Sequence, residues 1–377
     1  MPAPLDEYPL HQAPVTLAYV GTSDRNFYDR CYFNAHDRSG ELFLVTGLGF
    51  YPNLGVKDAY AAVRRGDTQH VIRMSDEIDD DRLTPHVGPY RIEVLEPLQR
   101  VRIVCDGTPS SDGGHGVAFD LTWDGSFPAI DEERHQLRTG RRTIVDTWRF
   151  AQVGTWSGVL RVGGDEIQVT PDTWVGTRDR SWGIRPIGEA EPAGRPGASD
   201  FGFWWLYVPI RFESFAIVII AQEDGAGHRT LNDAVRIWKD GTIEQLGWPR
   251  VQIDYASGTR HPQHARIHLT ERDGSSFVLD VEPGVGDSSR GYVPLHLGAG
   301  YGGDADWLHG AWRGPGWVEA ATYDLTDPAT LGRVQWGVVD HVARATVNDE
   351  IGWGLFEHGT IGRHAPSGFT DFMSVAP

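Results

Sequence analysis

The sequence predicts an all-β protein, and two observations carry this prediction. Short segments rich in β-branched and aromatic residues recur along the chain, each followed closely by Gly, Pro, Asn or Asp. Almost no segment keeps an apolar period of 3.6 residues over three turns, as an amphipathic helix would. Many short strands form a sandwich, a propeller or closed barrels, and the absence of a repeat of blade length disfavours the propeller.

Two hairpins are the most clearly marked elements. Residues 58–63 and 69–73 flank a short Arg-Arg-Gly-Asp turn, and residues 264–270 and 277–281 flank a turn that contains Gly274. Apolar and polar residues alternate strictly over 265–270, which is typical of a strand with one solvated face. Further strands are expected at 90–95, 100–105, 117–123, 159–162, 215–221, 234–238, 317–322 and 334–343.

The composition describes a compact globular chain. Hydrophobic residues make up 40% and charged residues 23% of the 377 residues, which excludes a disordered, collagenous or coiled-coil protein. The length favours two domains, and the best boundary is the segment 187–200, where Gly and Pro cluster without an apolar period. We therefore predict domains at residues 1–190 and 191–377.

Charge and hydropathy restrict the partners. The formal net charge of −18 repels phosphate backbones, so we expect no nucleic-acid partner. The longest apolar stretch, 201–221, is interrupted by Pro209, Arg211 and Glu213, so it predicts two adjacent strands and no insertion into a membrane. An apolar small molecule is the expected partner, and an assembly of identical chains stays open.

The cysteines and the N-terminus predict a cytoplasmic protein. Cys31 and Cys105 allow at most one disulfide, and two free thiols in a reducing compartment fit them better. The first residues lack the basic region and the apolar run of a signal peptide.

The densest cluster of charged and aromatic residues lies at 172–186. On a strand, Arg178, Arg180 and Trp182 share one face, and Asp179 and Ser181 lie on the other. Neighbouring guanidinium groups lower the pKa of a carboxyl group, whereas burial raises it. Two interpretations stay open: a functional carboxylate, or a salt-bridged strand end that closes a barrel.

A second segment, 26–53, interleaves polar side chains with aromatic ones. Tyr32, Phe33, Tyr51 and Asn53 belong to it, and such a mixture suits a mostly apolar pocket with a few polar groups. The alternative is a hairpin with a hydrophilic turn and aromatic core residues.

A third segment, 335–358, contains Trp336, Asp340, His341 and Glu357. Asp340 and His341 are adjacent on a strand, so their side chains face opposite ways and cannot form a dyad. His341 is either a core histidine or a base, and residues 357–359 are expected to end a strand near the surface.

We expect no metal and no cofactor. His264 and His268 share a strand face but would lie roughly 13 Å apart, too far for one zinc ion. The sequence has no zinc-protease motif, phosphate-binding loop, nucleophile elbow or dinucleotide fingerprint.

Residues 176–183, Gly-Thr-Arg-Asp-Arg-Ser-Trp-Gly, resemble a Gly-x-x-Asp-His-Ser-Trp-Gly stretch of one superfamily. This superfamily includes the carotenoid 1,2-hydratases and the AttH-like proteins. The early aromatic segment 28–33 and the late segment 357–359 follow the same order. The resemblance implies two lipocalin-like antiparallel β-barrels packed side by side, with an apolar cavity.

This sequence also departs from the pattern of the superfamily. Catalysis in the hydratases is attributed to a His and a Trp of the signature, with a Tyr-x-Asp further on. Trp182 matches the Trp, but Arg180 stands where the His is expected, and the Tyr-x-Asp has no secure match. Because arginine stays protonated, Arg180 cannot act as a general acid or base.

We therefore expect a cofactor-independent hydro-lyase, a hydratase, dehydratase or isomerase, that acts on a small apolar alkenol or terpenoid. This chemistry needs an acid, a base and an aromatic wall that tolerates positive charge. Asp179 is the first candidate for proton transfer, with Tyr51 and His341 as second choices. The expected substrate-binding residues are Trp182, Arg178, Tyr32, Phe33, Asn53, Trp205 and Trp336. The alternatives are a non-catalytic binding protein of lipocalin type for a hydrophobic ligand, and a cyclase that only folds a polyene.

Overall fold

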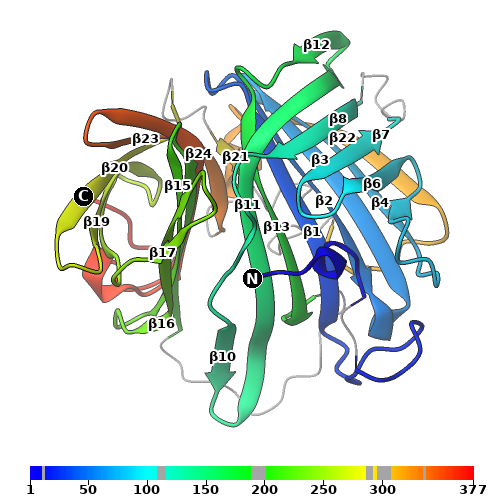
Figure 1. Ribbon diagram of the computed structural model, residues 1–377, viewed down its shortest axis with the longest axis horizontal. Coiled ribbons are helices and arrows are strands. Elements are labelled where there is room, and N and C mark those ends of the chain that lie inside the picture. The colour runs from blue at the N-terminus through cyan, green and yellow to red at the C-terminus, as the bar shows by residue number, and fades with distance from the viewer. Residues whose placement is uncertain (11–12, 108–115, 188–200, 286–291, 295–306, 334–336) are drawn as a thin grey trace.

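The computed structural model describes residues 1–10, 13–107, 116–187, 201–285, 292–294, 307–333 and 337–377. Most of these residues lie in β-strands, which confirms the all-β prediction. The strands form two curled antiparallel sheets that lie side by side, the second on the left and the first on the right of Figure 1. This is the arrangement of two lipocalin-like barrels.

The first sheet has 14 strands, in the order β22-β4-β3-β2-β1-β13-β11-β8-β7-β6-β5, with the short β9, β10 and β12 paired to β11. Its strands are β1 (Phe27–His36), β2 (Leu42–Tyr51), β3 (Val56–Arg65), β4 (Thr68–Glu77), β5 (His86–Val87), β6 (Tyr90–Glu96), β7 (Arg100–Cys105), β8 (Ala118–Gly125), β9 (Ile130–Asp131), β10 (His135–Thr139), β11 (Arg142–Val162), β12 (Asp165–Val169), β13 (Val175–Ile184) and β22 (Trp317–Asp324).

The second sheet has ten strands, in the order β17-β16-β15-β14-β24-β23-β20-β19-β18, with β21 paired to β23. Its strands are β14 (Gly202–Arg211), β15 (Phe215–Asp224), β16 (Arg229–Trp238), β17 (Ile243–Gln245), β18 (Arg250–Tyr255), β19 (Pro262–Thr270), β20 (Ser276–Pro283), β21 (Tyr292–Pro294), β23 (Val339–Val347) and β24 (Glu350–Gly362). The described helices are the short α1 (Pro328–Gly332) and the 3₁₀ turns η1 (Pro4–Glu7), η2 (Pro52–Leu54) and η3 (Ala365–Ser367), and none of them is long and apolar enough to cross a membrane.

The strand predictions agree with this architecture. The two expected hairpins are β3–β4 and β19–β20, and the stretch 201–221 forms β14 and most of β15. Ala265, Ile267 and Leu269 are fully buried on one face of β19, as the alternation predicts. Part of the expected strand 334–343 lies outside the described residues.

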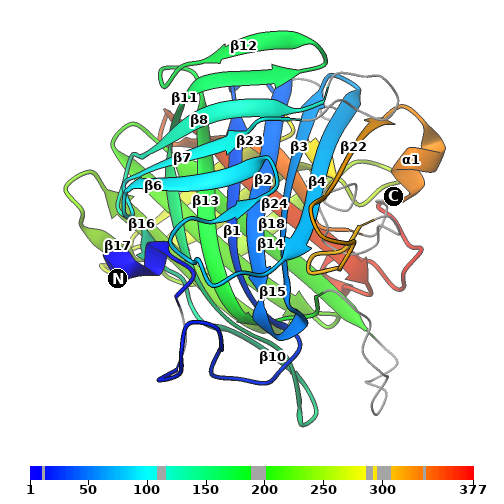
Figure 2. The same cartoon turned by 90° about the vertical axis from the view of Figure 1, so that its right-hand side faces the viewer.

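The first sheet includes a strand from the second half of the sequence. β22 pairs with β4, and Figure 2 shows it at that edge of the first sheet. Most of the boundary segment 187–200 lies outside the described residues. The division at residues 190 and 191 therefore stays a prediction.

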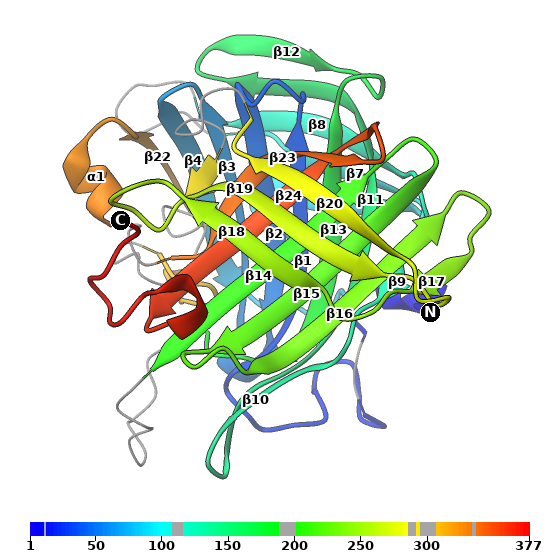
Figure 3. The same ribbon diagram turned by 90° about the vertical axis from the view of Figure 1, so that its left-hand side faces the viewer.

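Strand alternation divides the apolar side chains into three layers. One layer fills the first barrel, another fills the second, and a third lies between the two sheets. Tyr32 and Val153 of the first sheet join Trp205, Tyr207 and Leu355 of the second in this middle layer. In Figure 3 the second sheet lies in front of the first, and β14 and β24 cross over β1 and β13. The middle layer contains the candidate site.

Candidate active site

A cavity of about 290 Å³ lies between the two sheets. Its walls include residues of β1, β11 and β13 from the first sheet and of β14, β15 and β24 from the second. Apolar side chains such as Phe203, Ile220 and Ile361 line it together with carboxyl, guanidinium and phenol groups. A mostly apolar surface with a few polar groups is typical of small-molecule sites.

Asp179 reaches this cavity because of the alternation on β13. Asp179 and Ser181 face the second sheet, and Arg178 and Arg180 face the other way. Partial burial raises the pKa of the Asp179 carboxyl, and the guanidinium groups of Arg149, Arg30 and Arg185 oppose that shift. Within the described residues, no hydrogen bond engages this carboxyl group, so it is available to a ligand.

Arg178 and Arg180 form buried ion pairs. Nη1 and Nη2 of Arg178 donate to the Glu7 carboxylate at 2.6 and 3.0 Å, and Nε donates to Gln152 at 2.8 Å. Arg180 pairs with Asp29 and donates to the Glu7 backbone carbonyl. These buried contacts join η1 and β1 to the interior of β13. The ion pairs of the salt-bridge interpretation are therefore present, although they do not lie at a strand end.

Glu357 lines the cavity and belongs to a pair of carboxyl groups whose other member, Asp340, lies behind it. Asp340 of β23 lies directly opposite Glu357 of β24 in the sheet register. The Tyr32 hydroxyl donates to Asp340 Oδ2, and the Trp205 indole donates to Glu357 Oε1. Asp340 Oδ1 meets no N–H or hydroxyl donor within the described residues. The neighbouring Glu357 carboxyl can form a hydrogen bond with Asp340 only if one of the two carboxyls is protonated.

The electrostatics favour that shared proton. Burial raises the pKa of Asp340 well above its ordinary range, and the nearby Glu357 charge raises it further. Burial also raises the pKa of Glu357, whereas Arg149 lowers it. Two carboxyl groups this close share a proton because both cannot be ionised cheaply. The pair therefore retains a proton to a higher pH than an isolated carboxyl group does.

A second acid lies on the opposite wall. Burial raises the pKa of Glu132 to about 7, although its ion pair with Arg149 opposes the shift. The Arg149 guanidinium lies 4.3 Å above the Tyr207 ring and 5.8 Å above the Trp205 ring. Glu132 Oε1 and Arg149 Nη2 are buried without a hydrogen-bond partner among the described residues. Orphaned polar atoms of this kind mark a position that a ligand or water completes.

A neutral imidazole completes this wall. The His135 ring stacks on Trp205 at 5.8 Å, and burial together with Arg149 lowers its pKa to about 4. Because His135 is neutral at pH 7, it is a hydrogen-bonding group and a base of low strength.

The cavity brings together three of the residues predicted from the sequence, Asp179, Tyr32 and Trp205. Tyr51 lies outside it and donates to Asp58 Oδ1 at 3.0 Å, and burial with the Asp58 charge raises the pKa of its phenol well above the ordinary value. Asn53 donates to the backbone carbonyls of residues 22 and 24 and so fastens the N-terminal segment.

The remaining predicted residues are elsewhere. Phe33 belongs to the core of the first barrel, Trp182 lies on the far face of β13 from Asp179, and Arg178 binds Glu7. Trp336 lies outside the described residues. The roles assigned to all these residues from the sequence stay predictions.

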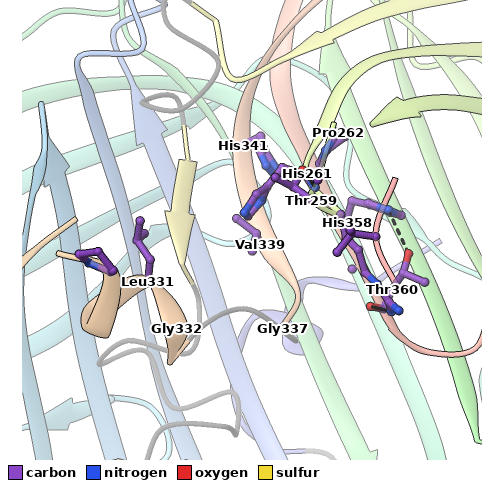
Figure 4. A pocket seen from close by; sticks show the side chains of 15 residues that line it. Thr259, His261, Pro262, Leu331, Gly332, Gly337, Val339, His341, His358 and Thr360 are labelled. Carbon is purple, nitrogen blue, oxygen red and sulfur yellow. Dashed lines mark hydrogen bonds between the residues drawn. The ribbon is translucent and has the colours of Figure 1, made fainter. Parts of the chain in front are cut away.

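His341 lies behind the candidate active site, in a second cavity within the other barrel. Its side chain faces the interior of the second barrel, where Nδ1 lies 3.0 Å from the Phe356 carbonyl oxygen. Figure 4 shows His341 beside His261 in this cavity. Asp340 faces the other way, as the alternation predicts.

Sequence reasoning missed most of the cavity's acids. Glu357 lies in the interior of β24, so the expectation that 357–359 ends a strand near the surface is wrong. The signal that identifies Asp340 and Glu357 is their cross-strand register, which requires knowing that β23 and β24 pair. Glu132 follows the short β9, and no strand period marks it.

No cluster of three His, Cys, Asp or Glu side chains in the described part of the chain has the geometry of a metal site.

Comparison with solved structures shows the fold. A protein described as AttH from Nitrosomonas europaea has a TM-score of 0.54 and 12% sequence identity, over 93% of this chain and 97% of that one. CghA, solved with Sch210972, has a TM-score of 0.52 and 11% identity over 90% and 89% of the two chains. These similarities confirm the lipocalin-like, AttH-like fold that the resemblance implied.

Kievitone hydratase from Nectria haematococca is 14% identical over 94% of this chain and 96% of that one, with a TM-score of 0.49. A search of curated proteins finds no match. A family model matches residues 3–370, almost the whole chain. The chain therefore belongs to the DUF8625 family, a family of unknown function.

Proposed function

We propose that the protein is a cofactor-independent hydro-lyase that adds or removes water at a small apolar alkenol or terpenoid in the cavity between the sheets. The observation that carries this proposal is the Asp340–Glu357 pair, whose Glu357 carboxyl lines the same cavity as the Asp179 carboxyl. Dehydration requires an acid and a base in one cavity; the carboxyl pair supplies the proton, and the Asp179 carboxylate is the base.

In the proposed dehydration, Glu357 is the acid because it lines the cavity, whereas Asp340 lies behind it. Glu357 protonates the substrate hydroxyl, the carbon–oxygen bond breaks, and water leaves. Asp179 then takes a proton from the adjacent carbon, and the electron pair of the broken carbon–hydrogen bond forms the double bond. Proton exchange with solvent restores both groups, and hydration is the same sequence in reverse.

The aromatic side chains stabilise the developing cation. Phe203 and Trp205 lie nearly parallel, at an interplanar angle of 6° and 6.3 Å apart, and both line the cavity. An aromatic face attracts a desolvated cation by about 2 kcal/mol. In this proposal Trp205 takes the role that the sequence assigned to Trp182. Tyr32 orients Asp340 through its hydroxyl.

The second candidate function is a binding protein of lipocalin type for a hydrophobic ligand. The departure at Arg180 favours it, because this side chain is committed to Asp29 and Glu7 and supplies no proton. In that case the cavity holds a ligand and its acids are structural.

The test is turnover of purified protein with secondary and tertiary alkenols and acyclic terpenols, followed by headspace gas chromatography. We compare the wild type with Glu357→Gln, Asp179→Asn and the matched control Glu282→Gln, whose exposed carboxylate pairs with Arg344 on the second barrel. Turnover lost in the first two and retained in the control supports the hydro-lyase. No turnover with any substrate, together with an apolar compound in an organic extract of the protein, supports the binding protein.

A further inference from the structure

A second cavity, of about 350 Å³, lies in the mouth of the second barrel. β23, β24, the start of β19 and α1 contribute its walls, and Figure 4 shows three imidazole rings around it, with Leu331 opposite. The cavity lies on the other face of β23 and β24 from the candidate active site, since His341 and His358 alternate with Asp340 and Glu357. Nothing in the proposed hydro-lyase reaction uses it.

The two buried imidazoles are neutral. Burial lowers the pKa of His341 and of His358 to about 3. His358 Nδ1 donates to the Trp205 carbonyl oxygen at 2.7 Å, and its Nε2 accepts from the Tyr255 hydroxyl at 3.0 Å. His341 Nδ1 donates to the Phe356 carbonyl, which makes its Nε2 an acceptor. Neither ring offers a positive charge to a ligand.

The other lining residues include one guanidinium, that of Arg260, and no carboxylate within the described residues. No Asp or Glu belongs to the described lining, so a cation has no counter-ion there. The guanidinium of Arg260 donates its N–H groups to carbonyl oxygens of Thr360, Gly362, Asp371 and Ser374 and to the Ser374 hydroxyl. An anion could bind this guanidinium only by displacing those bonds.

The remaining surface is apolar with a few hydroxyl groups. Leu331, Val339 and Val375 supply the apolar part, and the hydroxyls of Thr259 and Thr360 lie among them. A cavity of about 150 Å³ already holds a benzene molecule. We propose that this second cavity binds a small neutral molecule with an apolar body and a hydroxyl group, an alcohol or a phenol, at a site separate from the candidate active site.

Three probes with one aromatic body test the proposal at pH 7: 2-phenylethanol, phenylacetate and 2-phenylethylamine. Calorimetry gives the affinities, and the imidazole signals of His341 and His358 in NMR spectra report where each probe binds. We expect 2-phenylethanol to bind at least about tenfold more tightly than either ion and to shift both imidazole signals. Equal or tighter binding of phenylacetate, binding that leaves both signals unchanged, or binding of none of the probes overturns the proposal.

Two variants and a matched control locate the contacts. Thr360→Val keeps the shape and removes a hydroxyl, and His261→Leu removes the exposed imidazole at the rim. Each is expected to weaken 2-phenylethanol binding about threefold or more. His264→Leu, three residues further along the chain on β19 and bonded to Asp280 outside the cavity, leaves the affinity unchanged. Equal losses in all three variants contradict the proposal.

The test of the second cavity is independent of the proposed function. Glu357→Gln is expected to retain 2-phenylethanol binding and the His341 shift even if it abolishes turnover. If turnover is never observed and the probe still binds, the second site is supported and the hydro-lyase proposal is contradicted. If turnover is observed and the probe does not bind, the hydro-lyase is supported and the second site is contradicted.

Discussion

Asp340 and Glu357 face each other across β23 and β24, and each is held by an aromatic donor from a different sheet, Tyr32 from the first and Trp205 from the second. The carboxyl pair therefore depends on both sheets being in place. A proton shared by the two carboxyls lies at the contact between the sheets, in a buried layer of the molecule.

Replacing Glu357 by Gln should lower turnover about 100-fold or more, because the amide cannot protonate a hydroxyl group. Affinity for an unreactive ligand should change little, since Gln keeps the shape. Initial rates and a dissociation constant measured on the same preparation separate the two effects. A Glu357→Gln enzyme with undiminished turnover would exclude Glu357 as the acid.

Glu132 should make the protein less stable as the pH rises. Its pKa in the folded protein is raised to about 7, so the folded state retains a proton that the unfolded chain releases near the ordinary value of 4.5. The resulting stability is fully present below pH 4.5 and is lost as the pH rises through 7. Urea unfolding from pH 5 to 8 should show a falling free energy for the wild type relative to Glu132→Gln. A pH-independent difference between the two would show that Glu132 is ionised throughout.

Arg178 should matter for folding more than for chemistry. Arg178→Met leaves the Glu7 carboxylate buried and unpaired, which costs about 3 to 5 kcal/mol. Breaking the exposed Arg102–Glu93 pair with Glu93→Gln should cost about 1 kcal/mol or less. Urea midpoints of the two variants provide the comparison. Normal stability of Arg178→Met with lost turnover would restore Arg178 as a substrate-binding residue.

Gly176, the first residue of the signature stretch, should be needed for packing alone. A Cβ at this position would lie 1.9 Å from the Asn34 carbonyl oxygen and 2.7 Å from Trp156 Nε1. Gly176→Ala should therefore destabilise the first barrel by about 2 kcal/mol or more. Gly332→Ala, whose Cβ would meet nothing within 4 Å, is the matched control for thermal unfolding. Equal melting temperatures for the two variants would contradict this account.

The alternation of side chains along a strand predicted those features of the site that depend on a single strand. The opposite faces of Asp179 and Arg178 follow from the period of two, and so does the separation of Asp340 from His341. Burial as the cause of the raised Asp179 pKa was accessible from the sequence, but the groups that oppose it were not, because they are Arg149, Arg30 and Arg185 rather than its neighbours in sequence.

Tyr51 was proposed for the site because nothing local reveals its partner. Asp58 lies on the next strand, and only the β2–β3 pairing brings it to the Tyr51 hydroxyl. The ion pair of Glu132 and Arg149 was not predictable for the same reason, because the pairing of β9 with β11 brings the two residues together. Properties of a single strand were accessible to sequence reasoning, whereas pairs between strands were not.

The two cavities lie on opposite faces of β23 and β24, which makes the chain intolerant of insertions in the turn between these two strands. Asn348 and Asp349 connect the two strands, both with positive φ, of 46° and 71°, as in a two-residue type I′ turn. One added residue that shifts the pairing by one position would turn Glu357 toward the second barrel and His358 toward the cavity between the sheets. A single insertion would thereby exchange an acid and an imidazole between two cavities, so the length of this turn determines the chemistry of both.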